Sequence, residues 1–339
     1  GHMTQRRAVV TGGAGFIGSH AVDKLLEKDF TVRVIDDLRS GRIDNLKHVL
    51  DRPDVEFFET DICQLPPDSP IFAGTDLVLH FAGVGDIVPS IEHPAQYMRN
   101  NVIGTVCTLE ASRNAEVRQF IYAASSSCYG DNPPTPTGEY APLDPAYPYA
   151  LSKYQGEQAA LHWAKVYGMS VNSIRIFNAY GTRSRTSGAY GAVFGVFLKQ
   201  KLASEPFTVV GDGEQRRDFV YVTDVADAFI RAGLSDFSGQ IWNLGTGNPQ
   251  SVNRLVELLQ GPAIHIPKRP GEPETTWADS SKIMNDLGWA QETSFLEGVT
   301  KVLADIDYWA NAPLWNEESI AKATRTWFSL LDKSSQEEQ

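Results

Sequence analysis

Short β-branched apolar runs alternate with longer stretches of helical periodicity through the first half of the chain. We predict strands in the apolar runs, at 8–10, 31–35, 55–58, 77–81, 120–123 and 171–177. We predict helices where apolar residues recur every three or four positions, at 16–28, 95–113 and 149–167. Strands that alternate with helices imply parallel crossovers. The pattern therefore predicts an α/β fold with a Rossmann-type, doubly wound parallel sheet over residues 4–180.

The regular alternation of strand and helix patterns ends after residue 180. Loops rich in Gly and Pro separate further helical patterns, at 192–203, 252–260, 295–310 and 317–330. We interpret residues 181–333 as a smaller C-terminal α/β lobe that binds substrate, and we expect the segment near 218–244 to return to the first lobe. Three tryptophans are predicted to pack in the core or between the lobes rather than to line a ligand site: Trp309, Trp315 and Trp327. Residues 1–3 have the form of a cloning remnant, and the polar tail 334–339 is expected to fray.

The amino-acid composition bears on which kinds of molecule the protein can bind. The chain has 339 residues, 42% of them hydrophobic, which is ample for a large core. Acidic residues exceed basic ones by 42 to 30, and the formal net charge of −12 argues against a nucleic acid or a membrane as the main partner. No apolar run approaches the length of a membrane helix, and we expect no signal peptide. The three cysteines lack CxxC spacing and the seven histidines lack metal-ligand spacing, so we expect a cytoplasmic protein without a metal site.

A glycine-rich segment, TGGAGFIG at 11–18, follows the first predicted strand and opens the first predicted helix. Its G-x-x-G-x-x-G spacing allows a tight turn and lets backbone amides approach a pyrophosphate at the helix N-terminus. Asp36 ends the second predicted strand, where its carboxylate can accept both hydroxyls of an adenosine ribose and would repel a 2′-phosphate. NAD is therefore predicted over NADP, a preference that Arg39 and Arg42 weaken slightly. The predicted cofactor site comprises Gly12, Gly15, Phe16, Ile17, Gly18 and Asp36.

A phenol and an ammonium group lie four positions apart on one predicted helix, at Tyr149 and Lys153. A nearby lysine favours the phenolate and lowers the tyrosine pKa, and a positive nicotinamide ring would add to this effect, which makes Tyr149 a candidate general base. The alternative is an ordinary amphipathic helix, because this spacing is common. Upstream, a run of hydroxyls follows the fifth predicted strand, at Ser125, Ser126 and Ser127. Doubly wound folds bind ligands at this edge of the sheet, so one of these hydroxyls is expected to hydrogen-bond the substrate oxygen.

Together these motifs resemble the extended short-chain dehydrogenase/reductase family, in its UDP-sugar 4-epimerase and dehydratase branch. The resemblance runs from residue 8 to residue 330, with further matching blocks at 80–83, 101–105, 175–178, 216–220 and 269–272. It implies that Ser125, Tyr149 and Lys153 are catalytic, with Lys153 also holding the nicotinamide ribose. It adds cofactor contacts at Asp61, Ile62, Phe81, Ala82 and Asn101, of which Asp61 and Ile62 would cover the adenine. It also implies that Arg217 and Arg269 clamp the substrate diphosphate, the alternative being surface solvation.

The loop after Ser125 bears on the reaction. The 4,6-dehydratases that resemble this chain carry an Asp-Glu pair directly after the catalytic hydroxyl residue, and uronate decarboxylases keep a glutamate there. This chain has Ser126, Ser127 and Cys128 instead. The resemblance thus favours NAD-dependent C4 epimerisation of a UDP-sugar through a 4-keto intermediate. Another sugar-nucleotide oxidoreductase or dehydratase, a UDP-glucuronate 4-epimerase and a non-catalytic dinucleotide-binding regulator remain as alternatives.

The same resemblance places a set of residues around the sugar, which are Gly85, Ser125, Ser126, Ser127, Tyr149, Asn178, Ala192 and Thr276. Glucose/galactose-type relatives often have a lysine at the position of Gly85, and some have a tyrosine at that of Thr276. The small residues here favour UDP-N-acetylglucosamine and UDP-N-acetylgalactosamine, with plain hexoses and uronic acids left open. The alternative is that these small residues only pack closely.

The resemblance also implies a homodimer, formed by the helices predicted at 95–113 and 149–167. Val102, Val106 and Leu109 are expected to pack against the symmetry mate in a four-helix seam. The alternative is that these apolar residues pack only on their own sheet.

Overall fold

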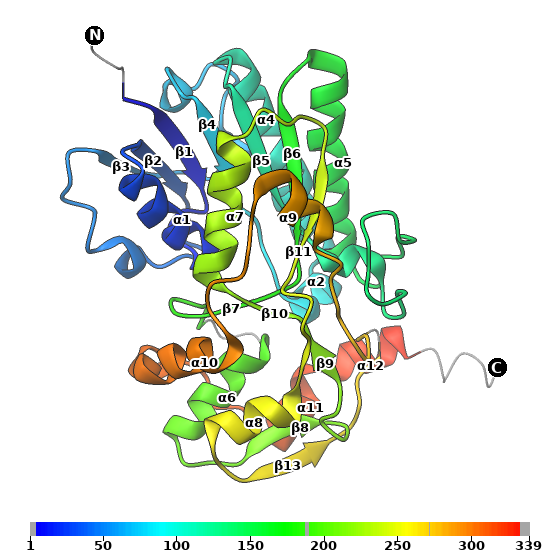
Figure 1. Ribbon diagram of the computed structural model, residues 1–339. Helices are drawn as coiled ribbons and strands as arrows, with labels where there is room; N and C mark the ends of the chain where they lie inside the picture. Colours follow the sequence, from blue (N-terminus) through cyan, green and yellow to red (C-terminus); the bar gives the residue numbers. More distant parts are fainter. Residues whose placement is uncertain (1–4, 187–189, 271, 333–339) are drawn as a thin grey trace.

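A seven-stranded parallel sheet forms the centre of the first lobe, in the upper half of Figure 1. The computed structural model describes residues 5–186, 190–270 and 272–332, so the expectations for residues 1–3 and 334–339 lie outside the described residues. The strand order is β11–β6–β5–β4–β1–β2–β3, which confirms the predicted doubly wound sheet. The strands are β1 (Arg7–Thr11), β2 (Thr31–Asp36), β3 (Val55–Glu59), β4 (Leu77–His80), β5 (Gln119–Ser125), β6 (Val171–Ile176) and β11 (Ile241–Leu244).

Successive residues of the strands supply two separate cores, one on each face of the sheet. In β1, Val10 joins the core beneath one layer of helices, which are α1 (Phe16–Glu27), α7 (Val222–Leu234) and α9 (Ser281–Leu287). Its neighbour Val9 joins the core beneath the opposite layer, which comprises α4 (Gly104–Asn114) and α5 (Pro148–Tyr167). Because both faces are covered, the central strands β1 and β4 contain continuous apolar runs rather than an alternation of apolar and polar residues.

The helix predicted at 95–113 is assembled from three pieces. It consists of α3 (Pro94–Met98), a π-helical turn (Arg99–Ile103) and α4. Leu109 on α4 is fully buried in its own lobe, because it points at the sheet. The expectation that Leu109 packs against a symmetry mate is therefore wrong. The exposed apolar side chains on and beside α4 and α5 include Ile103, at 52% exposure, Leu151, at 39%, and Val166, at 53%. Val102 and Val106 are half-buried.

The second lobe has an aromatic core of its own, which includes Tyr180, Phe197 and the fully buried Trp309. Its helices are α6 (Val193–Leu202), α8 (Val252–Leu259), α10 (Phe295–Ala304), α11 (Glu317–Ala323) and α12 (Arg325–Leu331). Its strand pairs are β8 (Phe207–Val210) with β13 (Ala263–Ile266) and β9 (Arg216–Arg217) with β12 (Gln250–Ser251). Two helices that the periodicity predicted as continuous, at 295–310 and 317–330, are each divided into two elements. A 3-10 turn over Ile306–Trp309 follows α10, and the buried Thr324 separates α11 from α12, its hydroxyl donating to the Ile320 carbonyl.

The chain crosses between the lobes several times. A parallel pair, β7 (Asn178–Tyr180) and β10 (Phe219–Tyr221), lies between them, as Figure 1 shows. From β10 the chain runs directly into α7 and then into β11, which pairs with β6 in the main sheet. The short helix α2 (Ile87–Glu92) also lies at this boundary, in contact with α12. These crossings bring residues from distant parts of the sequence to the edge of the sheet that faces the second lobe.

Candidate active site

Two cavities meet between the lobes, at the carboxyl ends of the sheet strands. The first, about 420 Å³, is lined by the glycine-rich loop and is called the glycine-loop cleft. The second, about 530 Å³, is lined by Arg217 and Arg269 and is called the arginine cavity. The described residues that line both cavities are called the junction, and they are Phe16, Asp86, Ser125, Tyr149, Phe177, Ala179 and Arg185.

The glycine-loop cleft has the form of a dinucleotide site. A methyl group on Gly12, whose φ is +69°, would come within 2.8 Å of the Ala82 nitrogen, and one on Gly18 within 2.2 Å of the Gly12 oxygen. Only glycine fits such close approaches of backbone to backbone. No side chain caps the N-terminus of α1, whose first amides can therefore bind an anion. The predicted cofactor residues that line this cleft are Gly12, Gly15, Phe16, Ile17, Gly18, Asp36, Asp61, Ile62, Phe81, Ala82, Tyr149 and Lys153.

Asp36 is held firmly at the end of β2. Its two carboxylate oxygens accept the backbone amides of Ala14 (3.0 Å) and Leu38 (2.8 Å). Arg39, which the sequence placed nearby, pairs with Asp37 (3.5 Å) and Asp61 (3.8 Å). The acidic groups therefore outnumber the cations at this end of the cleft, which suits ribose hydroxyls and disfavours a 2′-phosphate.

Asn101 supports the wall of the glycine-loop cleft without lining it. Its side chain is buried, accepts the Val84 amide (2.9 Å), and donates to the Val84 carbonyl (3.0 Å) and the Ser152 hydroxyl (2.9 Å). It does not line either cavity, whereas its neighbour Asn100 lines the cleft. The structure therefore gives Asn101 the role of positioning the loop after β4.

Tyr149 and Lys153 lie on the first turns of α5, which begins at Pro148. Burial raises the pKa of Tyr149 to about 12, although the hydrogen bond with Ser125 lowers it. Burial also lowers the pKa of Lys153 to about 8, against the opposing effect of the Glu157 carboxylate. We expected Lys153 to lower the pKa of Tyr149. In the protein without cofactor the pKa is raised instead, because the effect of burial is the largest one.

A rigid set of buried groups supports Lys153. Its ammonium lies 5.0 Å from the centroid of the Tyr122 ring, and the Tyr122 hydroxyl donates to the Lys153 carbonyl (2.7 Å). One turn further along α5, Glu157 forms a buried ion pair with Arg175 at 2.5 Å. Loss of one partner from such a pair leaves a buried charge uncompensated, so the pair fixes α5 against β6.

The serine run forms the start of a 3-10 turn at the end of β5. The Ser125 and Ser127 hydroxyls are 2.8 Å apart, and the Ser125 oxygen also accepts the Ser127 amide. Ser126 and Ser127 line the arginine cavity. Burial raises the pKa of the adjacent Cys128 to about 12, which keeps that thiol protonated and unreactive.

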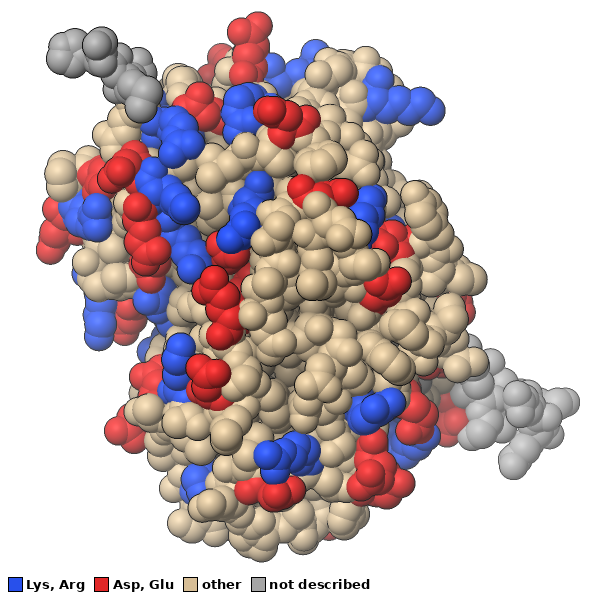
Figure 2. Space-filling model, in the orientation of Figure 1, with Lys and Arg blue, Asp and Glu red and all other residues tan. Residues whose placement is uncertain are grey.

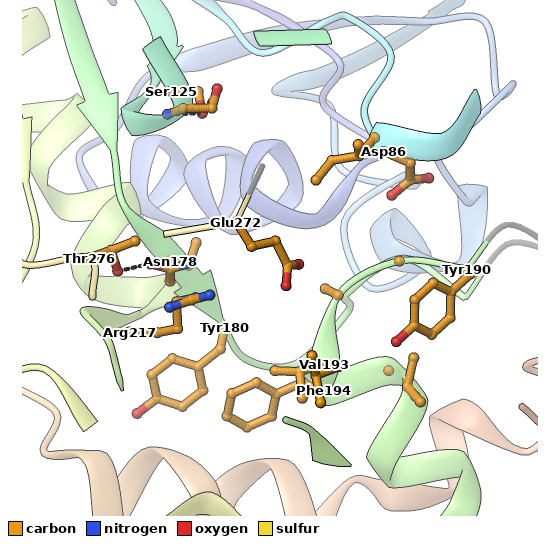
Figure 3. A pocket seen from close by; sticks show the side chains of 18 of the residues that line it. Asp86, Ser125, Asn178, Tyr180, Tyr190, Val193, Phe194, Arg217, Glu272 and Thr276 are labelled. Carbon is orange, nitrogen blue, oxygen red and sulfur yellow. Dashed lines mark hydrogen bonds between the residues drawn. The ribbon is translucent and has the colours of Figure 1, made fainter. Parts of the chain in front are cut away.

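The arginine cavity is bounded by the second lobe, as Figure 3 shows. Arg269 lies between the rings of Tyr190 (4.9 Å) and Trp327 (5.2 Å) and pairs with Glu272 at 3.1 Å. Arg217 projects into the same cavity from β9. Together the two guanidinium groups provide a site for an anionic ligand such as a diphosphate.

The predicted sugar-binding residues do not all lie in the arginine cavity. Asn178, Ala192 and Thr276 line it, and the Thr276 hydroxyl donates to the Asn178 side-chain oxygen (2.6 Å; Figure 3). Gly85 lines the glycine-loop cleft instead, with no atom within 4 Å of the place where a methyl group would stand. Trp315 and Trp327 both line the arginine cavity. They also pack as expected, because Trp327 is 2% exposed and Trp315 contacts the core of the second lobe.

Two charged residues at the junction are not among those predicted from the sequence. Asp86 directly precedes α2, and Arg185 follows β7, and their side chains form an ion pair at 2.5 Å. The available signal was the position of Asp86, a few residues after β4 at the edge of the sheet where doubly wound folds bind ligands. Arg185 gave no such signal, because its place follows from the crossing of the chain between the lobes.

Charge on the outside of the molecule is mixed. On the face shown in Figure 2, Lys and Arg side chains are interspersed with Asp and Glu, around a broad uncharged centre. Among the described residues, no group of three or more His, Cys, Asp or Glu side chains could hold a metal ion. None of the described helices has the length and apolar character needed to cross a membrane. The positive charge suited to an anionic ligand lies inside, at Arg217 and Arg269.

The model of the NAD-dependent epimerase/dehydratase family matches residues 8–245. The chain belongs to this family. It is 35% identical over 306 residues to the UDP-glucose 4-epimerase of Mycolicibacterium smegmatis, with 88% of this chain and 97% of that protein covered. The resemblance to extended short-chain dehydrogenases/reductases is confirmed, and the cofactor is NAD.

Two solved structures share the fold over nearly their whole length. The UDP-N-acetylglucosamine 4-epimerase of Methanobrevibacter ruminantium, in complex with UDP-N-acetylmuramic acid, has a TM-score of 0.84 at 30% identity, covering 89% of this chain and 98% of that one. The UDP-glucuronic acid 4-epimerase of Bacillus cereus, with UDP-glucuronic acid and NAD, has a TM-score of 0.82 at 28% identity, covering 90% of this chain and 99% of that one.

Tyr149→Phe should retain the fold and bound NAD but lose turnover by about 10²–10⁴-fold, because the phenol expected to exchange the substrate proton is then missing. Tyr154→Phe is the matched control, since it removes a phenol hydroxyl from the same helix away from both cavities. Steady-state rates, circular dichroism and cofactor content are measured for both variants. Turnover close to wild type in Tyr149→Phe would exclude this residue as the acid–base group.

Proposed function

We propose that this protein is a UDP-sugar 4-epimerase that interconverts UDP-N-acetylglucosamine and UDP-N-acetylgalactosamine. The observation that carries the proposal is the position of Ser125 and Tyr149 at the junction of the glycine-loop cleft and the arginine cavity. A sugar whose diphosphate is bound by the two arginines can reach both hydroxyls from one side and the cofactor from the other. The relatives named above act on UDP-linked sugars, which supports uridine as the base.

Each residue then has a chemical task. Arg217 and Arg269 bind the diphosphate and deliver the sugar to the junction. Ser125 hydrogen-bonds the C4 oxygen, and Tyr149 accepts the proton from the C4 hydroxyl and later returns it. When bound, NAD supplies reversible hydride acceptance at C4 and a positive charge that favours the Tyr149 phenolate. Lys153 adds a second positive charge on the cofactor side and positions the nicotinamide ribose.

Epimerisation also requires that the keto sugar present its other face, and the arginine cavity has room for this. Its volume is about 530 Å³, and short side chains such as Ala192 and Thr276 line it. We infer that the same space also receives an N-acetyl group at C2, which favours the hexosamine over the plain hexose. Loss of water from C6 would need a general acid near the sugar, and the loop after Ser125 supplies only Ser126, Ser127 and the inert Cys128.

The direct test incubates the protein with UDP-N-acetylglucosamine, UDP-glucose and UDP-glucuronate and separates the C4 epimers by chromatography. The proposal predicts UDP-N-acetylgalactosamine as the fastest-formed product, with no stoichiometric accumulation of NADH in the absorbance spectrum. A product lighter by one water in the mass spectrum, or stoichiometric NADH, would identify a dehydratase or a net dehydrogenase instead.

Thr276→Tyr should reduce kcat/KM for UDP-N-acetylglucosamine about 5- to 150-fold relative to UDP-glucose, because the added ring fills the volume that the N-acetyl group needs. The substitution also removes the hydrogen bond to Asn178. Thr276→Val is therefore the control, since it loses the same hydrogen bond without adding bulk. Equal losses on both sugars in Thr276→Tyr would contradict the steric argument.

We further propose a homodimer that pairs α4 and α5 with their symmetry mates. The exposed apolar side chains Ile103, Leu151 and Val166 on and around these helices support this surface. Sedimentation at micromolar concentration should give the mass of two chains, and Leu151→Glu should shift the protein toward the monomer. A wild-type monomer under these conditions would rule out the proposed seam.

A further inference from the structure

The loop that carries Asp86 is held in place on both sides. Asn101 binds the amide and the carbonyl of Val84, and the Tyr97 hydroxyl donates to the Gly85 carbonyl. Asp86 itself has a φ of +78°, a conformation that side chains other than glycine rarely adopt. Strained residues of this kind persist where the surroundings impose them, and they gather at functional sites. The structure thus fixes this carboxylate in one position.

That position is the junction, across from the second lobe. The Asp86 carboxylate reaches Arg185 at 2.5 Å, and the two side chains are 18% and 34% exposed. Among the described residues that line both cavities, Asp86 and Arg185 are the charged ones, and Ser125 and Tyr149 are the proposed catalytic ones. Asp86 is also close enough to Tyr149 for its charge to raise the pKa of that phenol.

The charged residues of the arginine cavity differ in how they are paired. Arg217 and Arg269 outnumber Glu272 among the lining residues, which leaves a net positive charge for a diphosphate. Asp86 neutralises Arg185 at the junction, where Ser125 and Tyr149 also lie. In the proposed mode of binding, C4 lies at these two hydroxyls, and the substituent on the adjacent C5 then lies near this ion pair.

We propose that Asp86 is a specificity-determining residue that neutralises Arg185 and thereby excludes UDP-uronates, which reserves the site for sugars whose C5 substituent is uncharged. A C5 carboxylate would face the Asp86 carboxylate in a site of low dielectric constant, where like charges repel strongly. Without Asp86, the planar guanidinium of Arg185 would be free to bind such a carboxylate in a bidentate manner. This inference rests on the proposed 4-epimerase function, whose substrate class it narrows.

The test compares wild type with Asp86→Asn and Asp86→Gly. Asparagine is nearly isosteric, tolerates positive φ and keeps a hydrogen-bond acceptor for Arg185, whereas glycine adopts this φ without strain and protects folding. The kcat and KM values for UDP-glucuronate and UDP-N-acetylglucosamine are measured for each protein. In both variants kcat/KM for UDP-glucuronate should rise about tenfold or more relative to UDP-N-acetylglucosamine.

Two controls separate this role from a general effect of charge. Glu92→Gln removes an exposed negative charge at the other end of α2 and should leave the ratio unchanged. Adding Arg185→Gln to Asp86→Asn should abolish the gain, since the guanidinium that binds the uronate is then missing.

The outcomes distinguish this inference from the function on which it rests. A wild type that prefers UDP-glucuronate, or Asp86 variants that epimerise UDP-N-acetylglucosamine with an unchanged preference, would overturn the role of Asp86 and leave 4-epimerisation standing. A protein that epimerises none of the three UDP-sugars would overturn the proposed function and this inference together.

Discussion

The site depends on ionisable groups that are buried next to one another. Keeping such groups charged away from water costs free energy, and this cost determines which of them are charged or paired. Tyr149 and Lys153 lie on the same face of α5 at the end of the parallel sheet, and burial pushes both toward their neutral forms. A positive charge brought by the cofactor would favour the Tyr149 phenolate, and in the proposed mechanism this links proton transfer to the presence of NAD.

The same constraint explains why charges elsewhere in the site come in pairs. Glu157 and Arg175 neutralise each other behind Lys153, and Asp86 and Arg185 do so in front of Tyr149. Arg217 and Arg269 outnumber Glu272 in the arginine cavity, so a net positive charge remains there for a diphosphate. Buried charges are costly unless they are compensated.

The parts of this structure that local pattern controls could be predicted from the sequence. Six of the seven strands, β1 to β6, lie in apolar runs of the sequence, and the glycine spacing at Gly12 and Gly18 allows the close backbone approaches of a strand–helix turn. Asp86 and Arg185 are 99 positions apart and meet only because the chain crosses between the lobes, so no local pattern reports their pairing. The break between α11 and α12 at Thr324 is likewise not marked by any interruption of the apolar periodicity at 317–330.

The central claim is that C4 is oxidised and reduced within one site without exchange with solvent. The direct measurement uses UDP-N-acetylglucosamine that carries deuterium at C4, incubated with the protein in ordinary water until the C4 epimers reach equilibrium. The account predicts that the UDP-N-acetylgalactosamine formed retains the full label by mass spectrometry and that no NADH accumulates. Loss of the label to solvent during epimerisation would contradict it.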